Sequence, residues 1–394
     1  MPSMKTVLAP LLRGLFINAL GSAVSLEAVG EETVGESADI HPDILELALS
    51  DSAVSSDGSL DEEKAAVELN SQSSKIGENQ PRDIRLVVGG RRYFFAVSAK
   101  GNAFSKNDPS ADKNSALGRS HVVSGKIAVV TGGAQGFGAE ISKGLLASGA
   151  SVYVADLNYD GAVRLCSDLN SQGYSGKAYP VSVNVAEEAS VEALFDFIAN
   201  TTGGLDLVVS NAGVLKASSV LEQDLKSFRF VTDVNYIGFF LMAKHAGLML
   251  RRQRRTAPEW MTDIVQINSK SGLEGSNKNG AYAGSKFGSI GLVQSFALEL
   301  VQYGIKVNAI CPGNFFDGPL WSDPVNGLFV QYLRSGKVPG AKTVADVKEY
   351  YEAKVPMKRG TVGADVMRAL YYLVEQKYET GQALPVTGGQ VMLN

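Results

Sequence analysis

The stretch "GKIAVVTGGAQGFG", Gly125 to Gly138, decides how the chain folds. A short apolar run is followed at once by a glycine-rich turn and then by the helical pattern Phe137–Ser148. Glycines at 132, 136 and 138 allow a tight turn and a close approach of the backbone to a pyrophosphate. The helix that begins there offers free N–H groups and a favourable dipole. The stretch therefore predicts a strand, a phosphate-binding turn and a helix, in that order.

The same alternation continues toward the C-terminus. Short apolar runs separated by longer helical patterns follow from Gly125 onward: "KIAVVT", "SVYVAD", "AYPVSV", "LDLVVS", "DIVQIN" and "IKVNAI". Continuous apolar strands suit a sheet that is buried on both faces, and the helices between them imply right-handed parallel crossovers. We therefore expect an α/β fold with a doubly wound parallel sheet, of the Rossmann type, over residues 125–394.

The first third of the chain differs in composition. We expect residues 1–100 to form a small α+β appendage and residues 101–124 a polar linker. "DIRLVVGGRRYFFAV" predicts a hairpin that turns at Gly89-Gly90, whereas Pro42–Leu49 and Leu60–Leu69 predict helices. The opening "MKTVLAPLLRGLFINALGSAVS" superficially resembles a signal peptide, but Arg13 interrupts its apolar run. We favour an amphipathic helix there, and no motif in this region indicates chemistry.

Composition narrows the class of protein. The 394 residues are 45% hydrophobic and 20% charged with a net charge of −4, which gives no reason to expect binding to nucleic acid or anionic membranes. No run of roughly 18 apolar residues predicts a membrane span. Cys166 and Cys311 lack metal-ligand spacing, so we expect no metal site and a reducing cytoplasm. The basic cluster Arg251–Arg255 favours a solvated helix end.

Two further strand ends carry polar or small residues. Asp156 ends the second apolar run, eighteen residues after Gly138. A carboxylate there accepts hydrogen bonds from both ribose hydroxyls and repels a 2′-phosphate, which favours NAD over NADP. The alternative is an Asp that caps a helix without any ligand. After the fourth run, "SNAGV" lets the backbone pass close to an adenine–ribose unit.

A possible proton-transfer unit lies in "QINSKSGLEGSNKNGAYAGSKFG", Gln266 to Gly288. Tyr282 and Lys286 are one helical turn apart, and Ser269 precedes Tyr282 by thirteen residues. These groups either transfer protons or merely decorate a helix and its loop. Ser269 follows the fifth strand at the carboxyl edge, where such sheets bind ligands, and Ser271 is the competing serine. The nucleotide turn upstream favours chemistry over decoration.

Over about residues 125–394 the chain resembles the short-chain dehydrogenase/reductase family, because its motifs occur together and in the family's order. These motifs are TGxxxGxG, Asn211–Gly213, Asn235 in "DVNYIG", Ser269, Tyr282 with Lys286, "CPGNF" and "TGQALPVTGG". The resemblance implies an NAD-dependent dehydrogenase. Tyr282 would act as general acid/base with a pKa lowered by Lys286, Ser269 would hold the substrate oxygen, and Asn235 would hold a water. The implied cofactor contacts are Gly132, Gln135, Gly136, Phe137, Gly138, Asp156, Asn184, Val185, Asn211, Ala212, Gly213, Tyr282, Lys286, Pro312, Gly313 and Phe315.

One of these positions departs from the family pattern, because Asn184 stands where the family usually has an Asp that contacts adenine. The stretches "VPMKRG" and "VTGGQVM" look most like the polyol-phosphate 2-dehydrogenases. We therefore expect interconversion of a polyol phosphate and a ketose phosphate. The alternatives are a dehydrogenase of an unphosphorylated polyol or small secondary alcohol, and a nucleotide sensor without turnover.

The substrate side of the site follows from the same resemblance. "PGNFFDGPLW" and the helical stretch to about Tyr351 occupy the position of the family's substrate lid, where related enzymes differ. Lys216 and Lys270 are candidates to meet a substrate phosphate, whereas Lys278 is expected to be a solvated surface lysine. The resemblance also implies a homotetramer packed partly through the helix that carries Tyr282.

Overall fold

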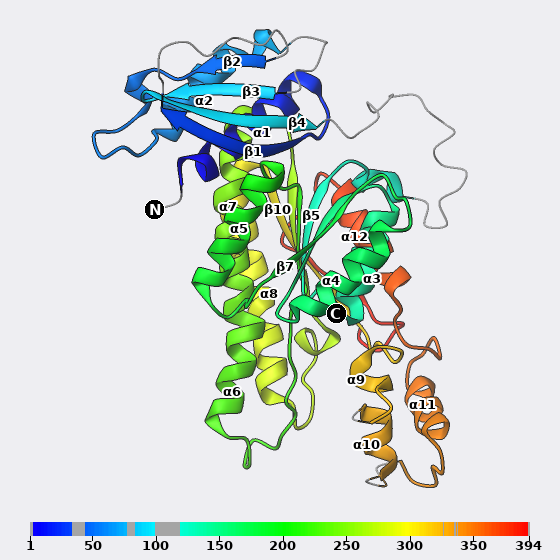
Figure 1. The fold of residues 1–394 in the computed structure, drawn as a ribbon. Helices are drawn as coiled ribbons and strands as arrows, with labels where there is room; N and C mark the ends of the chain where they lie inside the picture. The colour runs from blue at the N-terminus through cyan, green and yellow to red at the C-terminus, as the bar shows by residue number, and fades with distance from the viewer. Residues whose placement is uncertain are drawn as a thin grey trace.

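The computed structural model describes residues 3–33, 44–76, 83–98, 119–325, 327–334, 336 and 338–392. Its centre is a seven-stranded sheet in the order β11-β10-β9-β8-β5-β6-β7, in which every neighbouring pair is parallel (Figure 1). The strands are β5 (Ile127–Thr131), β6 (Ser151–Asp156), β7 (Ala178–Ser182), β8 (Leu207–Ser210), β9 (Thr262–Ile267), β10 (Ile305–Pro312) and β11 (Ala383–Val386). The expected doubly wound α/β fold is confirmed.

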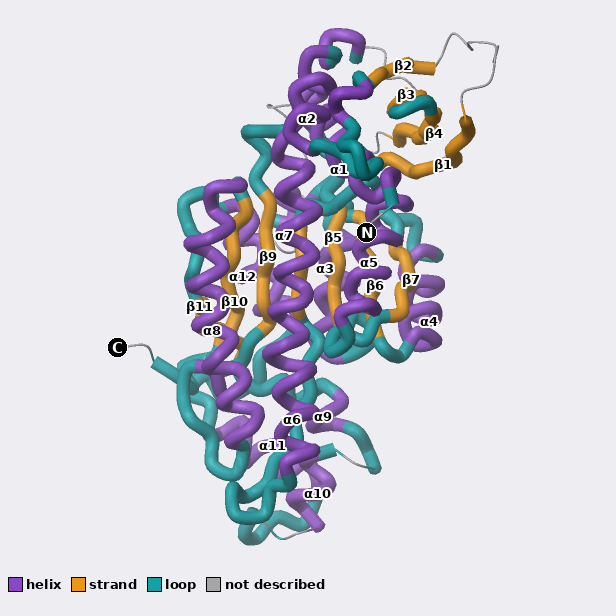
Figure 2. The backbone as a smooth tube through the Cα atoms, turned by 90° about the vertical axis from the view of Figure 1, so that its left-hand side faces the viewer, coloured by secondary structure: helices purple, strands orange, loops and turns teal. Residues whose placement is uncertain are grey.

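Helices cover both faces of this sheet, which explains why its strands are largely apolar. On one face lie α5 (Glu188–Thr202), α7 (Gly238–Thr256) and α8 (Gly280–Leu300), and on the other lie α3 (Gly136–Ala147), α4 (Tyr159–Asn170) and α12 (Gly363–Glu375) (Figure 2). Successive residues of β5 point to alternate faces: Val129 packs in the first layer and Val130 in the second. Burial on both sides favours apolar side chains at most strand positions, and Asp263 and Lys306 are buried as an ion pair instead.

The carboxyl ends of the strands carry the additional helices. A π-helix, Asp233–Ile237, joins α6 (Leu225–Thr232) to α7. The helices α9 (Pro319–Ser322), α10 (Leu328–Arg334) and α11 (Val344–Ala353) project beyond this edge (Figure 1). They enclose a small core of their own, in which the Phe316 and Trp321 rings lie 4.9 Å apart edge to face. These helices occupy the stretch that the sequence assigns to a substrate lid.

The N-terminal residues 3–33, 44–76 and 83–98 form what we call the N-terminal module. It contains α1 (Met4–Leu20), α2 (Glu62–Ser71) and a second sheet in the order β1-β4-β3-β2, with β1 (Ser25–Thr33), β2 (Ile44–Ala48), β3 (Asp83–Val88) and β4 (Arg91–Ser98). The predicted hairpin is confirmed: β3 and β4 are antiparallel, and Gly89 and Gly90 turn with φ of 53° and 71°. The predicted linker 101–124 lies mostly outside the described residues, which resume at Arg119.

Two helix predictions in this module have different outcomes. The helix over Leu60–Leu69 is confirmed as α2. The helix over Pro42–Leu49 is wrong, because Ile44–Ala48 is a strand that pairs in parallel with β3. Its two leucines, Leu45 and Leu47, are spaced by two and therefore fall on one face of a strand, where Leu47 is fully buried. Pairing with β3 decided between two patterns that a short apolar run leaves open.

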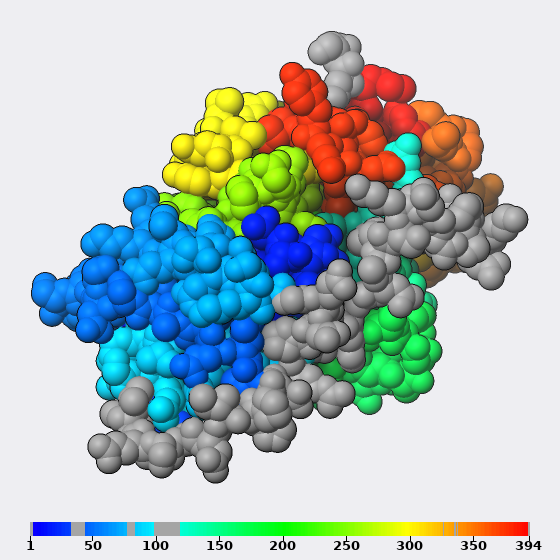
Figure 3. Space-filling model, turned by 90° about the horizontal axis from the view of Figure 1, so that it is seen from above, coloured from blue at the N-terminus to red at the C-terminus, as the bar shows by residue number. Residues whose placement is uncertain are grey.

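The N-terminal module packs against helices that cover the seven-stranded sheet. The helix α1 contacts α7 and α5, and seen from above the blue module lies directly against the yellow-green surface of the rest of the chain (Figure 3). Residues Thr6 to Ile17 of α1 are all buried, so the expected amphipathic helix is wrong: no polar face is left to solvent over this segment. The helix packs between the sheet of the N-terminal module and the helices α5 and α7 that cover the seven-stranded sheet.

A buried polar network fastens this contact. The Arg13 guanidinium is fully buried and donates to Asp206 Oδ2 at 2.8 Å and to Gln253 Oε1 at 2.7 Å. Asp206 also accepts from the backbone N–H of Ile127, where β5 begins, and from Trp260 Nε1, each at 2.8 Å. The module is therefore bound to the first strand of the catalytic sheet through one carboxylate.

The basic cluster at the end of α7 belongs to the same contact. Arg252 Nε lies 2.8 Å from Glu62 Oε1, and Arg255 Nε lies 3.5 Å from Glu62 Oε2, at the start of α2. The interpretation of this cluster as a solvated helix end is wrong, because two of its arginines pair with the module. Among the described residues, no helix has the length and apolar character needed to cross a bilayer.

Candidate active site

The glycine-rich turn between β5 and α3 has no space for side chains at two of its glycines. A Cβ at Gly138 would lie 1.9 Å from Gly132 O, and a Cβ at Gly132 would lie 3.0 Å from the Ala212 Cα. Gly132 and Gly136 also adopt the left-handed conformation, with φ of 59° and 56°. The turn thus exposes backbone at the N-terminus of α3, which fits a dinucleotide pyrophosphate.

The end of β8 holds this turn in place. Asn211 Nδ2 donates to Thr131 O at 2.9 Å and to Gly132 O at 3.1 Å. In return, Thr131 Oγ1 accepts from the backbone N–H groups of Asn211 and Ala212. The predicted residues Asn211, Ala212 and Gly132 are therefore brought together by the structure, and the glycine turn is rigid before any ligand binds.

Asp156 lies against the same turn. Its Oδ2 accepts from Ala134 N at 3.0 Å and its Oδ1 accepts from Asn158 N at 2.9 Å. The helix that follows is capped by Asn158, whose side chain accepts from Gly161 N. The alternative that Asp156 is merely the cap of that helix is therefore wrong, and the carboxylate faces the turn where a ribose would lie.

Three other predicted cofactor contacts are Asn184 and Val185 after β7 and Gln135 within the glycine turn. Asn184 uses both ends of its carboxamide in its own turn, donating to Glu187 Oε1 at 2.8 Å and accepting from Ala186 N at 3.2 Å. Val185 is buried beside Gly238 of α7, and Gln135 is the exposed N-cap residue of α3. Their contacts with a cofactor stay predictions.

The candidate catalytic residues meet where β8, β9 and α8 converge. Lys286 is 4% exposed, and its Nζ donates to Ile267 O at 3.0 Å and lies 5.7 Å from the centroid of the Tyr282 ring. A Cβ at Gly213 would lie 3.7 Å from the same Nζ, so the end of β8 reaches this group as well. Tyr282 is half-buried in the first turn of α8, and Ser269 is half-buried just after β9.

Sequence reasoning gave Asn268 no role, yet it joins these elements. Its Nδ2 donates to the backbone carbonyl of Lys286 at 3.0 Å, and its Oδ1 accepts from Ser269 N at 2.8 Å. A buried carboxamide thereby fixes the strand end that carries Ser269 to the helix that carries Lys286. The signal in the sequence was a polar residue directly before the candidate serine at a strand end.

Asn235 lies in the π-helix and connects the loop after β8 to α8. Its Oδ1 accepts from Val214 N at 2.8 Å, and its Nδ2 donates to Val214 O at 2.9 Å and to Ser285 Oγ at 3.1 Å. The wider turn of a π-helix frequently marks a functional position. The side chain is thus fully used in positioning, and the expected water at this residue stays a prediction.

Burial dominates the titration of the site. It raises the pKa of Tyr282 above its usual value, and a hydrogen bond from Ser269 opposes that shift. Burial also lowers the pKa of Lys286 to about 8. The expected lowering of the phenol pKa by Lys286 together with bound cofactor stays a prediction, because without a cofactor burial dominates the pKa of Tyr282.

The structure supports Ser269 over Ser271 as the partner of the phenol. Ser269 is the serine whose side chain opposes the rise in the Tyr282 pKa, whereas Ser271 is buried and donates its backbone N–H to Ser269 Oγ at 3.1 Å. Cys311, at the end of β10, is a buried neighbour of the pair, and burial raises the pKa of its thiol to about 12.

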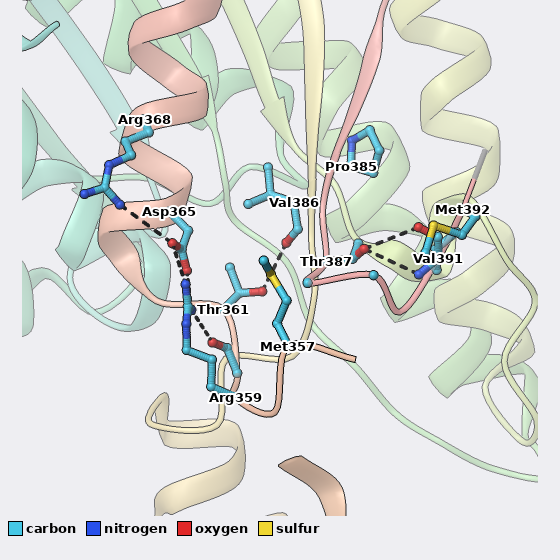
Figure 4. A pocket seen from close by; sticks show the side chains of 13 residues that line it. Met357, Arg359, Thr361, Asp365, Arg368, Pro385, Val386, Thr387, Val391 and Met392 are labelled. Atoms are coloured by element: carbon cyan, nitrogen blue, oxygen red, sulfur yellow. Dashed lines mark hydrogen bonds and ion pairs between the residues drawn. The ribbon is translucent and has the colours of Figure 1, made fainter. Parts of the chain in front are cut away.

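The lid approaches the glycine turn through an aromatic contact. The Phe137 and Phe315 rings stack with centroids 4.4 Å apart. Gly313 N donates to Val386 O at 2.9 Å, which ties the turn after Pro312 to β11. Beside it lies a cavity of about 400 Å³ at the end of β11, in which Arg359 and Arg368 flank the Asp365 carboxylate (Figure 4).

The candidate substrate lysines are not gathered at one point. Lys216 is exposed, with its Nζ 5.2 Å from the centre of the Phe230 ring, and Lys270 follows Ser269 in a short 3₁₀ turn. A second cavity, of about 350 Å³, is lined instead by Lys278 and Asn279, just before α8. Sequence reasoning missed Asn279; its position as the residue that begins a helix was the available signal. In the described part of the chain no cluster of three or more His, Cys, Asp or Glu could hold a metal.

Comparison with known proteins agrees with this geometry. Residues 126–320 match the model of the short chain dehydrogenase family. The chain is 37% identical over 270 residues to sorbitol-6-phosphate 2-dehydrogenase of Escherichia coli, covering 68% of this chain and 99% of that protein. It is 30% identical over 270 residues to galactitol 2-dehydrogenase of Agrobacterium fabrum, covering 68% of this chain and 98% of that one.

The crystal structure of sorbitol-6-phosphate 2-dehydrogenase from Erwinia amylovora is similar over 68% of this chain and 100% of its own, with a TM-score of 0.61 and 40% identity. An actinorhodin polyketide ketoreductase with NADPH is similar over 67% and 97%, with a TM-score of 0.58 and 26% identity. The chain thus carries the glycine turn, Asn211 and the Ser269, Tyr282 and Lys286 set within a fold that it shares with known dehydrogenases and reductases. The chain belongs to the short-chain dehydrogenase family.

Proposed function

We propose that the chain is an NAD-dependent polyol-phosphate 2-dehydrogenase that interconverts a polyol phosphate and a ketose phosphate, with sorbitol 6-phosphate as the leading substrate. The observation that carries the proposal is the convergence of Ser269, Tyr282 and Lys286 beside a glycine turn that only backbone can line. The identity to two sorbitol-6-phosphate 2-dehydrogenases, 37% and 40%, supports the substrate class.

The residues divide the chemistry among themselves. Ser269 donates a hydrogen bond to the substrate oxygen, and Tyr282 takes the proton of the substrate hydroxyl during oxidation and returns it during reduction. Bound NAD supplies the hydride acceptor and a positive charge beside the phenol. Lys286 and Asn268 keep α8 and the end of β9 in register, so that the hydroxyl and the phenol address the same oxygen.

NAD rather than NADP follows from Asp156. Its carboxylate is 9% exposed and fixed by Ala134 N and Asn158 N at the end of β6. A negative charge held in this position accepts hydrogen bonds from ribose hydroxyls and repels a 2′-phosphate. The family uses both nucleotides, so this single side chain supports the choice.

Two alternatives are kept beside this proposal. The identity to galactitol 2-dehydrogenase favours an unphosphorylated polyol as the second candidate substrate. A nucleotide sensor without turnover is disfavoured, because a sensor has no use for a phenol, a serine and a lysine brought to one point. A small secondary alcohol remains the third case for the assay.

The proposal includes a setting for the enzyme. A homotetramer is supported by apolar side chains exposed on α7 and α8, where Phe240, Phe287 and Leu298 are uncovered. A reducing cytoplasm is supported by Cys166 and Cys311, which are both buried and unpaired.

The test is an assay of NADH formation with sorbitol 6-phosphate, sorbitol, galactitol and butan-2-ol. We expect sorbitol 6-phosphate to have the highest kcat/KM, and Tyr282→Phe to lower kcat by about 10²–10⁴-fold because general acid–base catalysis is lost. NADH binding, measured by fluorescence, is the control that the variant is folded. Faster turnover of free polyols would refute the phosphate assignment, and an active Phe variant would refute the mechanism.

A further inference from the structure

Asn268, the residue between the end of β9 and Ser269, is a carboxamide buried between the strand end and α8. It is 4% exposed, and its Nδ2 donates to Lys286 O at 3.0 Å and to Gln266 Oε1 at 2.9 Å. Its Oδ1 accepts from Ser269 N at 2.8 Å. The oxygen of this side chain thus holds the serine, and the nitrogen holds the helix that carries Tyr282.

The short turn that follows lies directly on this carboxamide. A Cβ at Gly272 would lie 2.2 Å from Asn268 Oδ1 and 3.1 Å from Lys286 O, so no side chain fits between the turn and the carboxamide. The 3₁₀ turn Lys270–Gly272 is therefore packed against Asn268. The place of its middle residue, Ser271, depends on this packing.

The turn determines the direction in which the Ser269 hydroxyl donates. Ser269 Oγ accepts the backbone N–H of Ser271 at 3.1 Å. A hydroxyl has one proton and two lone pairs, so an oxygen that accepts from this N–H keeps its proton for another partner. That partner is Tyr282: burial raises the pKa of the phenol, and the hydrogen bond that it receives from Ser269 opposes the rise.

We propose that Asn268 is a positioning residue, whose carboxamide holds Ser269 and α8 at the separation and in the orientation at which the serine hydroxyl donates to the phenol of Tyr282. The inference rests on the proposed oxidation of a polyol at Tyr282 and names the group that aligns its two hydroxyls. Asn268 acts through Ser269 and α8, because both of its amide hydrogens and its oxygen are paired within the protein. Groups aligned before the substrate binds need no reorganisation during the reaction.

The alignment has a consequence for the titration of the phenol. Among the described residues, the titratable side chains beside Tyr282 are Lys286, with its Nζ 5.7 Å from the ring centre, and Cys311 at the end of β10. Asn268 is uncharged and contacts only the backbone carbonyl of Lys286, so its removal changes the charge of neither group. A weaker hydrogen bond from Ser269 leaves burial less opposed and raises the pKa of Tyr282 further.

The test measures oxidation of sorbitol 6-phosphate by variants of the full chain. For Asn268→Ala we expect kcat to fall by about 10–100-fold and KM to stay within about three-fold, because alignment is lost rather than substrate binding. We also expect the acidic limb of the kcat–pH profile to move to higher pH, since oxidation needs the phenolate. Gly272→Ala displaces the carboxamide without removing any polar group, and we expect it to change kcat and the profile in the same direction.

Asn308→Ala is the matched control. Asn308 is fully buried in β10, and its carboxamide also donates to a carbonyl, Glu379 O at 3.1 Å, and accepts from a backbone N–H, Gln382 N at 3.0 Å. We expect this variant to be destabilised like Asn268→Ala, as judged by urea denaturation, but to keep kcat within about two-fold and the pH profile unmoved. A purely structural role for Asn268 predicts the same behaviour in both variants.

The outcomes separate this inference from the proposed function. Folded Asn268→Ala and Gly272→Ala enzymes with the kcat and pH profile of the wild type overturn the positioning role, and the proposed function stands. If the wild type oxidises no polyol, the proposed function fails, and crystal structures of the wild type and of Asn268→Ala decide on the inference. A contact between Ser269 Oγ and Tyr282 Oη that lengthens beyond hydrogen-bond distance in the variant supports it, and an unchanged contact overturns it.

Discussion

Replacing Arg13 with Met is expected to destabilise the whole protein, although Arg13 lies far from the candidate active site. The Arg13 guanidinium donates to Asp206 across 193 positions of sequence, and neither side chain has measurable exposure in the pair. Removing the cation leaves Asp206 with two donors, Ile127 N and Trp260 Nε1, and no compensating positive charge in contact. Gln253 Oε1 loses its 2.7 Å donor as well.

The size of the effect follows from the burial. Breaking a fully buried ion pair by removing one partner costs about 3–5 kcal/mol, since the charge left behind is neither paired nor hydrated. Met fills much of the volume of the Arg side chain, so a cavity adds little. We therefore expect the free energy of unfolding at pH 7 to fall by about 3–5 kcal/mol.

The fall in unfolding free energy caused by Arg13→Met also depends on pH. Burial alone would raise the pKa of Asp206, but the charges of Arg13 and Lys126, together with hydrogen bonds from Arg13 and Ile127 N, outweigh burial and hold that pKa below the usual value. In the wild type the pair thus stabilises above the unfolded pKa, and this is lost as pH falls through the folded pKa. Without Arg13 burial prevails and raises the folded pKa, so the penalty in the variant shrinks as pH falls and the carboxylate takes a proton.

Urea denaturation at pH 7 and pH 5, followed by circular dichroism, measures both effects. We expect the difference between wild type and Arg13→Met to be larger at pH 7. The control is Arg85→Met in the same module, because its partner Glu46 is 48% exposed and stays hydrated, so the cost is below about 1 kcal/mol. A loss for Arg13→Met that is equally small, or that does not change with pH, would refute the assignment of Arg13 as the fastening residue.

Two further changes address the nucleotide end. Gly138→Ala would place a Cβ 1.9 Å from Gly132 O, so we expect a loss of about 1–3 kcal/mol in unfolding free energy and weaker NADH binding by fluorescence titration. Gly284→Ala in α8, with open space around its Cβ, is the control. Equal losses of stability and of NADH binding in the two variants would contradict the role of the glycine turn. Asp156→Asn removes a charge that would lie near a 2′-phosphate, so we expect the NAD-to-NADP ratio of kcat/KM to fall at least about ten-fold; an unchanged ratio would show that Asp156 does not select the nucleotide.

The features that the sequence predicted correctly are all determined by short stretches of the chain. The strand and turn around Gly132 and Gly138, the hairpin at Gly89-Gly90, and the spacing of Tyr282 and Lys286 each follow from backbone or helix geometry over a few residues. Within such windows, propensity and periodicity are set by the chain itself. The sequence therefore predicted the catalytic fold and which side chains it would bring to the carboxyl edge.

The parts that sequence missed depend on contacts between distant segments. In the sequence Arg13 is a polar interruption of an apolar run, and its partner Asp206 is known only from the fold. Likewise the cluster around Arg252 was interpreted as solvated, because its partner Glu62 lies far away in the sequence. β2 looked helical because a short apolar run does not fix its own period, and pairing with β3 decided it.

The pKa values of the site carry the synthesis one step further. Burial raises the pKa of Tyr282, so at neutral pH the phenol holds its proton, which is the form that the proposed mechanism needs for reduction of a ketone. Oxidation of a polyol needs the phenolate instead. Burial lowers the pKa of Lys286 to about 8, so its ammonium is mostly charged at pH 7.

In the proposed mechanism the hydrogen bond from Ser269 stabilises the phenolate, and an oxidised cofactor beside Tyr282 would add a positive charge to that stabilisation. Under the proposed function, the acidity of Tyr282 would therefore depend on the redox state of the bound cofactor. The buried site that disfavours an idle phenolate is the same low-dielectric site in which a neighbouring cation acts most strongly on it. Burial of Tyr282, which looks unfavourable for a base, is thus what makes its basicity depend on the nucleotide beside it.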